Sequence, residues 1–555
     1  MILDRLDQTF PRFAFARRLP PRRIATRIVR RIEQATGIAG RAAPPPALRL
    51  RRAAELPAPA FAPRSIAASS GPDGWHFTFL GTSRSFGPDI AWHPDDPALG
   101  QLWLMNLHYM EFLEVLAPDC GLAAILSWIA ANPAGAKGAH RAGWNAYALS
   151  LRVVCWMQWL SRHGETVCPS DLCRIELSLS AQLGWLARFP ETDLGGNHLV
   201  KNIKALLWGA ACFEGPVAIR WQNRATGILR AELRRQVLSD GVHFERSPSY
   251  HNQVAADLIE CCSVLPAAER QEFAPLVSRM IAVAGALTHP DGRPAQFNDA
   301  GLSMAYAAGK LAASWPYPVP ALSSGCVLPE GGFGALLSPG FSTFIKFGEI
   351  GAEALPAHAH GDIGSIELSF GLDRLVVDQG VYEYVEGSRR DASRAAQSHN
   401  VTSPDNEPMA DFFGAFRCGW RPVPCVEQAH ANGSGLNVTV SHDGFRGAET
   451  GHCNRVRRTL RATPETVLIE DSLSRAPNVP WASRFLLHPA WACSHEDSRL
   501  VIGKGRVRLV CEADLAGEVE DAWWWPDMGI ALPTRRIVFR WPAGHQSLTI
   551  RFAAV

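Results

Sequence analysis

Histidines and carboxylates lie close together in the segment Pro356-Ala-His-Ala-His-Gly-Asp362. Alternate side chains of an extended segment point to the same face, which predicts that His358 and His360 lie side by side. A strand-like segment and a turn follow, and they can return Asp378 beside these histidines, with His399 coming next. Imidazole and carboxylate groups are zinc ligands. The spacing matches no zinc-finger pattern, so hydrogen-bonded histidines at strand ends are the alternative.

A second polar cluster, Asp193-Leu-Gly-Gly-Asn-His-Leu-Val-Lys-Asn202, lies between two helical patterns. Gly195 and Gly196 are suited to end the first helix, and Asn197 is suited to cap the second. An ordinary helix junction would explain these residues equally well. Chemistry is expected here only if the cluster faces the same cleft as other reactive groups.

A third cluster, Asp240-Gly-Val-His-Phe-Glu-Arg-Ser-Pro-Ser-Tyr-His251, forms a loop that leads into a helix. Tyr250 near the helix start could be a catalytic phenol. A half-buried packing residue is the more common role for a tyrosine at such a position.

The elements that must position these clusters are of two kinds. Most of residues 75–323 show apolar side chains at three- to four-residue spacing, without intervening strands, which predicts a helical bundle or an α/α toroid. The predicted helices are Gln101–Leu116, Asn145–Arg162, Asp171–Phe189, His198–Glu214, Ile219–Leu238 and Gln253–Leu265.

From about Gly325 onward the chain consists of short segments rich in β-forming residues and bounded by turn residues. Such spacing predicts an antiparallel β-sandwich, so the whole chain reads as an α+β, two-domain protein. The predicted strands are Phe341–Phe347, Ser365–Phe370, Leu375–Asp378, Leu436–Ser441, Arg457–Arg461, Thr466–Asp471, Leu500–Val501, Val507–Glu512 and Arg536–Arg540.

The charge of the 555-residue chain is uneven. Residues 1–52 hold thirteen arginines and three acids, a net charge of +10, whereas the remainder carries 42 basic and 50 acidic side chains, a net charge of −8. The near-zero overall net charge of +2 gives no support for a nucleic-acid binder. In residues 22–33, isoleucine and valine recur at helical spacing on one side and arginine on the other. This pattern is typical of a helix that docks on an anionic membrane or a partner. A solvated helix packed on its own domain is the alternative.

The sequence favours a cytoplasmic or peripheral inner-membrane location. Arginine or proline interrupts every apolar run near the N-terminus, whereas a secretory signal needs about 7–15 apolar residues. No run approaches the roughly 20 apolar residues that span a bilayer. The thirteen cysteines include no CxxC pair, which favours reduced thiols. Periplasmic export is the alternative.

Seven segments together resemble the heparinase II/III superfamily of polysaccharide lyases. This resemblance covers most of residues 75–555 and implies an incomplete α/α toroid over residues 75–324 and an antiparallel β-sandwich over 325–555. Residues 1–74 precede it as a basic extension and linker. The segments occur in the family's order and are Leu102–Tyr109, Trp144–Arg152, Gly195–Asn202, Gly241–Tyr250, His289–Arg293, His358–Asp378 and Ser398–Asn400.

The resemblance also implies catalytic roles. It assigns Asn197 and His198 to the uronate carboxylate, Tyr250 to the catalytic tyrosine and His358 to a histidine of the cleft.

It further implies a zinc ion, bound by His360, Asp378 and His399, that supports the shape of the site. Three protein ligands leave a fourth position, so a catalytic zinc is the alternative.

Four further residues are implied to bind the saccharide. Trp144, Arg152 and Glu245 would line the groove, and either Tyr382 or Tyr384 would fill the place of a further family tyrosine; we favour Tyr384.

These residues predict a lyase that cleaves a uronic-acid-containing polysaccharide by β-elimination and leaves a 4,5-unsaturated uronate. Tyrosine, histidine and asparagine suit removal of the C5 proton and stabilisation of the resulting enolate. The alternative is a non-catalytic polysaccharide-binding protein or an accessory protein of exopolysaccharide biosynthesis. A glycoside hydrolase ranks last, because it needs two carboxylates across a cleft. The acidic body favours a carboxylated polymer over a highly sulfated one, and the oligomeric state stays open.

Overall fold

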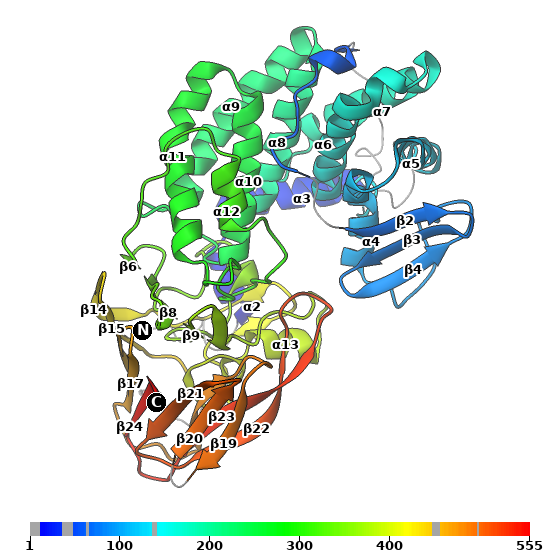
Figure 1. The fold of residues 1–555 in the computed structure, drawn as a ribbon. Coiled ribbons are helices and arrows are strands. Elements are labelled where there is room, and N and C mark those ends of the chain that lie inside the picture. Colours follow the sequence, from blue (N-terminus) through cyan, green and yellow to red (C-terminus); the bar gives the residue numbers. More distant parts are fainter. Residues whose placement is uncertain (1–10, 36–47, 63–65, 136–140, 447–454, 497–498) are drawn as a thin grey trace. The chain divides into compact units, whose positions relative to one another are not determined.

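A computed structural model describes residues 11–35, 48–62, 66–135, 141–446, 455–496 and 499–555. The chain divides into two compact units (Figure 1). The helical unit comprises residues 20–235 and 254–277, and the β-rich unit comprises residues 236–253 and 278–555 together with the described residues before position 20. The units therefore divide the chain elsewhere than the predicted boundary at 324, because the helix start that carries Tyr250 clusters with the β-rich unit.

Helices dominate the helical unit, and the six predicted helical segments are present. Two of the helices, α6 and α8, pack on each other and are buried around most of their circumference, which places them at the centre of the unit. The main helices of the chain are α4 Gln101–Tyr109, α5 Pro118–Ala131, α6 Ala146–His163, α7 Pro169–Arg188, α8 Gly196–Cys212, α9 Pro216–Gln236, α10 Pro248–Val264 and α11 Ala267–Ala286.

A small antiparallel sheet lies at the start of this unit, in a region that was predicted to be mainly helical from about residue 75. Its strands are β2 Ala67–Gly71, β3 Gly74–Phe79 and β4 Thr82–Phe86. Trp75, Phe77 and Phe79 are all buried, and they alternate with more exposed residues at the two-residue period of a strand. The two-residue alternation and the glycine turns at its ends therefore give strands here, although the segments that follow are helical.

A basic helix, α3 Pro21–Ala35, precedes this sheet and belongs to the helical unit. It has its polar side against the protein: Arg23 is buried, while Ile24, Ile28, Val29 and Ile32 are 38 to 55% exposed. The amphipathic helix predicted over residues 22–33 is therefore present. Its apolar side faces solvent, which is the reverse of a helix that packs on its own domain.

The β-rich unit contains three larger antiparallel sheets among its described residues (Figure 1). One has the order β10-β9-β8-β7-β6, the second β11-β18-β23-β22 and the third β14-β15-β16-β17-β24-β21-β20-β19. Buried side chains from all three form one core, including Phe341, Val438 and Phe485. The bounds are β6 Gly325–Leu328, β7 Phe333–Leu336, β8 Phe341–Lys346, β9 Ile366–Phe370, β10 Asp373–Val376, β11 Thr402–Pro404, β14 Cys425–Asn432, β15 Gly435–His442, β16 Val456–Ala462, β17 Thr466–Leu473, β18 Trp481–Leu486, β19 Ala492–Glu496, β20 Arg499–Lys504, β21 Val507–Ala513, β22 Gly517–Trp524, β23 Leu532–Trp541 and β24 Ser547–Ala554.

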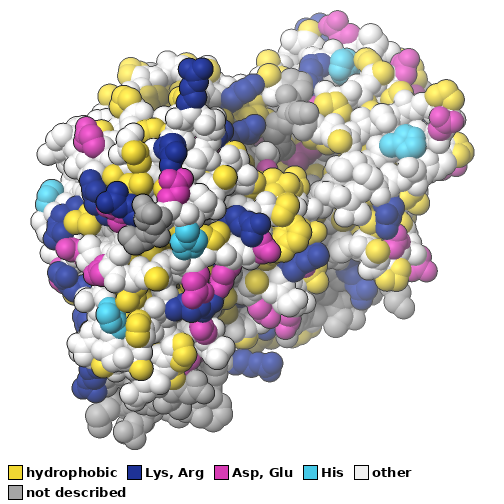
Figure 2. All heavy atoms as spheres, turned by 60° about the horizontal axis from the view of Figure 1, so that its bottom comes forward, with side chains coloured by type: hydrophobic (Ala, Val, Ile, Leu, Met, Phe, Trp, Pro, Cys, Tyr) yellow, Lys and Arg dark blue, Asp and Glu magenta, His cyan; other side chains and the backbone are white. Residues whose placement is uncertain are grey.

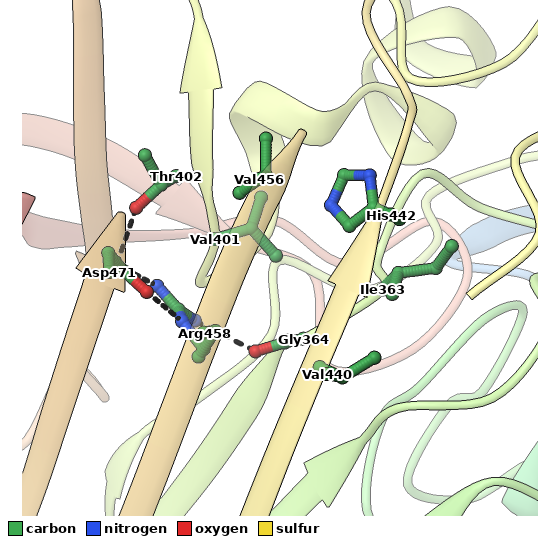
Figure 3. A pocket seen from close by; sticks show the side chains of 9 residues that line it. All are labelled: Ile363, Gly364, Val401, Thr402, Val440, His442, Val456, Arg458 and Asp471. Carbon is green, nitrogen blue, oxygen red and sulfur yellow. Dashed lines mark hydrogen bonds and ion pairs between the residues drawn. The ribbon is translucent and has the colours of Figure 1, made fainter. Parts of the chain in front are cut away.

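A buried ion pair between two strands of the sandwich also holds two loops of the β-rich unit, those at Gly364 and Asn400 (Figure 3). Arg458 on β16 donates to both carboxylate oxygens of Asp471 on β17, at 2.7 and 2.6 Å. Its remaining amino group donates to the carbonyl oxygens of Gly364 and Asn400 at 2.8 and 2.5 Å. The small cavity beside this pair is lined by three valines and an isoleucine together with Gly364, Thr402 and His442. Arg458 thereby fixes the loop that follows Asp362 and the loop that follows His399.

The substitution Arg458→Met should lower the free energy of unfolding of the β-rich unit by about 3 kcal/mol, because it leaves Asp471 buried without its partner. Urea unfolding followed by tryptophan fluorescence measures this change. Arg461→Met is the matched control: its partner Glu470 also lies on β17, but both side chains are about half exposed, so less than about 1 kcal/mol is expected. Equal losses in the two variants would contradict the bracing role of Arg458.

Candidate active site

Tyr250 is fixed at the start of α10 by the serines around it. Ser247 Oγ donates to the carbonyl oxygen of Asp299 at 3.0 Å, and Ser249 Oγ donates to that of Gly301 at 2.7 Å. The tyrosine ring is stacked on the imidazole of His358, with ring centroids 3.8 Å apart. Its hydroxyl lies 2.9 Å from the hydroxyl of Tyr384. Of the two tyrosines considered for the further position, the structure therefore brings Tyr384 to Tyr250.

His358 is held between two carboxylates. Its Nδ1 lies 2.9 Å from Asp299 Oδ2, and its Nε2 lies 3.1 Å from Glu245 Oε2. Burial alone would lower the pKa of His358, but the hydrogen bonds to Asp299 and Glu245 outweigh it and raise the pKa to about 9. The ring is therefore a cation at neutral pH. It can neutralise negative charge beside Tyr250 but cannot accept a proton.

Asp299 connects the site. Besides His358, it accepts a hydrogen bond from His360 Nε2 at 2.7 Å and two from Arg390, at 2.5 and 2.9 Å. Asp299, His360 and Arg390 are fully buried. Burial favours the neutral acid, yet Arg390 and then His360 hold the pKa of Asp299 well below its ordinary value.

The hydroxyl of Tyr250 carries its proton in this environment. Burial, followed by the charge of Asp299, raises its pKa above the ordinary value. Tyr250 is thus suited to donate a proton, and its contact with Tyr384 offers a route by which the proton can be shared.

Two of the predicted zinc ligands have free nitrogens. His360 Nδ1 and His399 Nε2 are buried without a hydrogen-bond partner, and the two rings have centroids 5.3 Å apart. Asp378 Oδ2 instead lies 2.7 Å from His399 Nδ1, the arrangement of a carboxylate that orients a metal-bound histidine. Among the described residues, no three His, Cys, Asp or Glu side chains converge on one point. The two nitrogens thus suit zinc, whereas Asp378 supports one of them.

The residues predicted to bind the uronate carboxylate lie in the helical unit. Gly195 and Gly196 have positive φ angles of 66° and 59°, which glycine adopts readily. The preceding loop ends at Gly195, and α8 begins at Gly196. Asn197 therefore lies in the first turn of α8 and not at its N-cap. His198 is next to it; its side chain is 37% exposed, with Nδ1 3.3 Å from Glu191 Oε1.

The structure gives the three predicted groove residues other partners. Arg152 is fully buried and donates to Gln182 Oε1 and to the carbonyl oxygens of His108 and Gly143. Trp144 is buried as well, and its indole N–H donates to the carbonyl oxygen of Asn132. These two residues hold the helical unit together, and because both are buried they do not line a groove.

Glu245 also differs from its predicted groove-lining role. It is 1% exposed, and the pairing with His358 accounts for its position.

Sequence reasoning missed Asp299 and Arg390. The segment Gln296-Phe-Asn-Asp299 has no recognisable spacing, and Arg390 is one of three arginines in Ser388-Arg-Arg-Asp-Ala-Ser-Arg394. A weak signal exists at Asn298, which has a φ of 58°. Asparagine tolerates this conformation better than most residues, and polar residues held there often cluster at functional sites.

Arg23 of α3 is a further residue that the sequence did not single out. A Cβ atom placed on Gly195 would lie 2.5 Å from an amino nitrogen of Arg23, so the guanidinium occupies the space that a side chain would need. Arg27, one turn later, lies 3.8 Å from Asp193. The basic helix is therefore packed against the loop that leads into Asn197.

The chain thus combines a helical unit, an antiparallel β-sandwich and a Tyr–His–carboxylate centre in the β-rich unit. Family models match on both sides of residue 320: the heparinase II/III N-terminus over residues 122–315, and the heparinase II/III-like C-terminal region over residues 322–553. These matches cover most of the sequence. The chain belongs to the heparinase II/III family.

Curated relatives match over part of their length. A heparin-sulfate lyase of Bacteroides stercoris is 28% identical over 262 residues, which are 42% of this chain and 39% of the relative. A heparin-sulfate lyase of Bacteroides thetaiotaomicron is 30% identical over 144 residues, which are 25% of this chain and 20% of the relative. The matched segments thus span well under half of these relatives.

Solved structures show the same fold. A crystal structure of heparinase III superposes with a TM-score of 0.69 at 16% identity, covering 84% of this chain and 79% of that one. The heparan sulfate lyase of Pedobacter heparinus gives a TM-score of 0.57 at 17% identity, covering 86% and 81%. The prediction of an incomplete α/α toroid followed by an antiparallel β-sandwich is confirmed.

Proposed function

We propose that this protein is a polysaccharide lyase that cleaves a uronic-acid-containing polymer by β-elimination and leaves a 4,5-unsaturated uronate at the new nonreducing end. The observation that carries the proposal is the arrangement of Tyr250, which is stacked on a cationic His358 and hydrogen-bonded to Tyr384. Membership of the heparinase II/III family and the names of its relatives, heparin-sulfate lyases, support it.

Each group has a task in this reaction. The C5 proton of a uronate is weakly acidic, so the charge that develops on the carboxylate must be neutralised by fixed donors. His358 supplies a cation in the β-rich unit. For Asn197 and His198, on the first turn of α8 in the helical unit, this task is the one that the family resemblance implies. As Tyr250 gives its proton to the C4 oxygen of the breaking linkage, the phenol pair with Tyr384 takes up the C5 proton in the same step, so that both phenols are protonated again at the end.

We propose that the polymer carries carboxylates and few sulfates. On the face shown in Figure 2, basic and acidic side chains are interspersed, without a broad basic field. The net charge of −8 over residues 53–555 agrees with this. A densely sulfated chain would call for a more basic surface.

The lyase proposal predicts that the wild-type protein increases the ultraviolet absorbance of a uronate polymer as unsaturated ends form. Tyr250→Phe should lower kcat at least about 100-fold, because removing a positioned proton-transfer group costs about that much, while polymer affinity is retained. Leu177→Ala, at an exposed site on α7, is the control and should have full activity.

The same two measurements also test the alternative, a non-catalytic accessory protein. Polymer binding without any unsaturated product, and no effect of Tyr250→Phe, would identify a non-catalytic accessory protein. Hydrolysis without unsaturation would also contradict the lyase.

A zinc ion bound by His360 and His399, with Asp378 as a ligand or as a support, forms part of the proposal. When bound, it would supply positive charge that links two loops of the β-rich unit. The two free buried imidazole nitrogens support this assignment.

Metal analysis of the purified protein should therefore find about one zinc per chain, and His399→Ala should lower this content severalfold. If the role is structural, removing zinc from the wild-type protein should leave lyase activity wherever circular dichroism shows an intact fold. Loss of activity in an intact fold would indicate a catalytic zinc, and absence of bound zinc would contradict the site.

The exposed apolar side of α3 supports a peripheral location at an anionic membrane. Ile28 and Ile32 are each 55% exposed on a helix within the +10 segment. Such a helix can insert its apolar side among lipid headgroups. Among the described residues, no helix has the length and apolar character needed to cross a bilayer.

The double substitution Ile28→Asp and Ile32→Asp should lower co-sedimentation with vesicles containing anionic phospholipid at least about tenfold, since it removes the apolar contact. Leu177→Asp places the same charge at an equally exposed site on α7 and should have no effect. Failure of the wild-type protein to bind these vesicles would contradict the membrane proposal and favour a protein partner.

A further inference from the structure

Two consecutive arginines of the helix α13 Ser388–Arg394 lie over two tyrosines that are separated by one residue. The guanidinium of Arg390 lies 5.0 Å from the ring centre of Tyr384, and that of Arg389 lies 4.1 Å from the ring centre of Tyr382. The structure therefore contains two Arg–Tyr pairs in succession. We call Arg390–Tyr384 the inner pair and Arg389–Tyr382 the outer pair.

The inner pair belongs to the site already described. Arg390 is fully buried, and its charge is neutralised by Asp299. The hydroxyl of Tyr384 lies 2.9 Å from that of Tyr250. This pair has no free charge to offer a ligand.

The outer pair has the opposite character. Arg389 is exposed, and in the part of the chain that the structure describes no carboxylate lies within ion-pair distance of it. A guanidinium that stacks on an aromatic ring keeps its edge N–H groups available for bidentate binding of an anion. Arg389 therefore presents an unneutralised cation.

The platform under Arg389 is fixed from behind. The ring of Tyr382 has an edge-on contact with Trp525, with centroids 5.8 Å apart. The backbone of Tyr382 accepts a hydrogen bond from the N–H of Gly529 at 2.9 Å, and Trp525 N–H donates to the carbonyl oxygen of Gln379 at 2.8 Å. Because these contacts come from the loop after β22, Tyr382 cannot move away without disturbing that loop.

The two pairs are separated by a distance that suits a polymer. Two residues of chain span at most about 7 Å, so Tyr382 lies within that distance of Tyr384 along the backbone. This is comparable with the rise of one sugar residue in an extended polysaccharide. An anionic polymer held at Tyr250 can therefore reach Arg389 with the sugar that adjoins the cleaved linkage.

We propose that Arg389, stacked on Tyr382, binds an anionic substituent of the sugar adjoining the cleaved linkage and so forms a charged subsite next to the reacting tyrosines. The inference rests on the proposed function. A carboxylate and a sulfate ester offer the same pair of oxygens to a guanidinium, so the anion is named by this shared chemistry.

The test compares Arg389→Ala, Arg389→Lys and a control, Arg506→Ala, which removes an exposed arginine from the turn between β20 and β21. On the polymer that the wild type cleaves, Arg389→Ala should raise KM about tenfold, the size expected for loss of one charge-assisted contact, with kcat changed less than twofold. Arg389→Lys should recover part of this loss, and the control should match the wild type.

Two modified substrates identify the anion. In the first, the uronate at the cleaved linkage is kept and the carboxylate of the adjoining sugar is reduced to an alcohol. If Arg389 binds a carboxylate, the wild type and Arg389→Ala should have the same KM on this oligosaccharide. In the second, the sulfate esters are removed. If Arg389 binds a sulfate, the two proteins should have the same KM on this desulfated oligosaccharide. A KM for Arg389→Ala within twofold of wild type on the unmodified polymer would overturn the proposal.

Failure of the proposed function gives a different result. In that case the wild type releases no unsaturated product from any polymer, and the dissociation constants of the same oligosaccharides, measured by calorimetry, decide about Arg389. Binding weakened about tenfold in Arg389→Ala, but not in Arg506→Ala, would support the subsite; unchanged binding would overturn it.

Discussion

The buried carboxylate of Asp299 is the group around which the candidate site is organised. A carboxylate without solvent is stable only if donors surround it, and here two histidines and an arginine do so. These donors come from residues 358 to 360 and from residue 390, far from Asp299 in sequence. One anion thereby sets the distance between the loop before β9 and helix α13, and with it the position of both rings that contact Tyr250.

This arrangement is supported from the sandwich by a second buried pair. Arg458 and Asp471 lie on adjacent strands, and the remaining donors of Arg458 are used on the backbone of Gly364 and Asn400. The loops that carry Asp362 and His399 are thus fixed to a rigid sheet. Such contacts hold the side chains of a site on loops nearly as firmly as those of a site on strands or helices.

The sequence allowed much of the fold to be predicted, because long stretches have a single clear period. The helices α6 to α10 and the strands from β8 to β23 that were predicted from apolar spacing are present, with ends shifted by a few residues. The sheet β2–β4 was not predicted, since three alternating aromatic residues are too short a pattern to stand out beside a helical region. The clustering of His358 with Tyr250 required a family resemblance, because over 100 residues separate them.

Other features of the site could not be read from residue types. Arg152 and Arg389 both lie within helices, yet Arg152 is buried with backbone and glutamine acceptors, whereas Arg389 is exposed and lies over a tyrosine ring. Only the fold decides which of these charges is neutralised. Asp299 illustrates the converse, since a single aspartate without a motif becomes the most highly bonded group of the centre.

The contact between Arg23 and Gly195 links two positions that are 172 residues apart in the numbering of the chain. A side chain at position 195 would displace the guanidinium and would also strain a backbone with a φ of 66°. Among homologous sequences, an arginine at the first position should therefore occur together with glycine at the second. Homologues without the basic helix lose the steric requirement but keep the conformational one, and a φ of 66° with a ψ of −150° is open to glycine almost alone, so glycine is expected there as well. Two independent requirements, the backbone conformation and the space taken by Arg23, therefore restrict this position of the loop that leads to Asn197 to glycine.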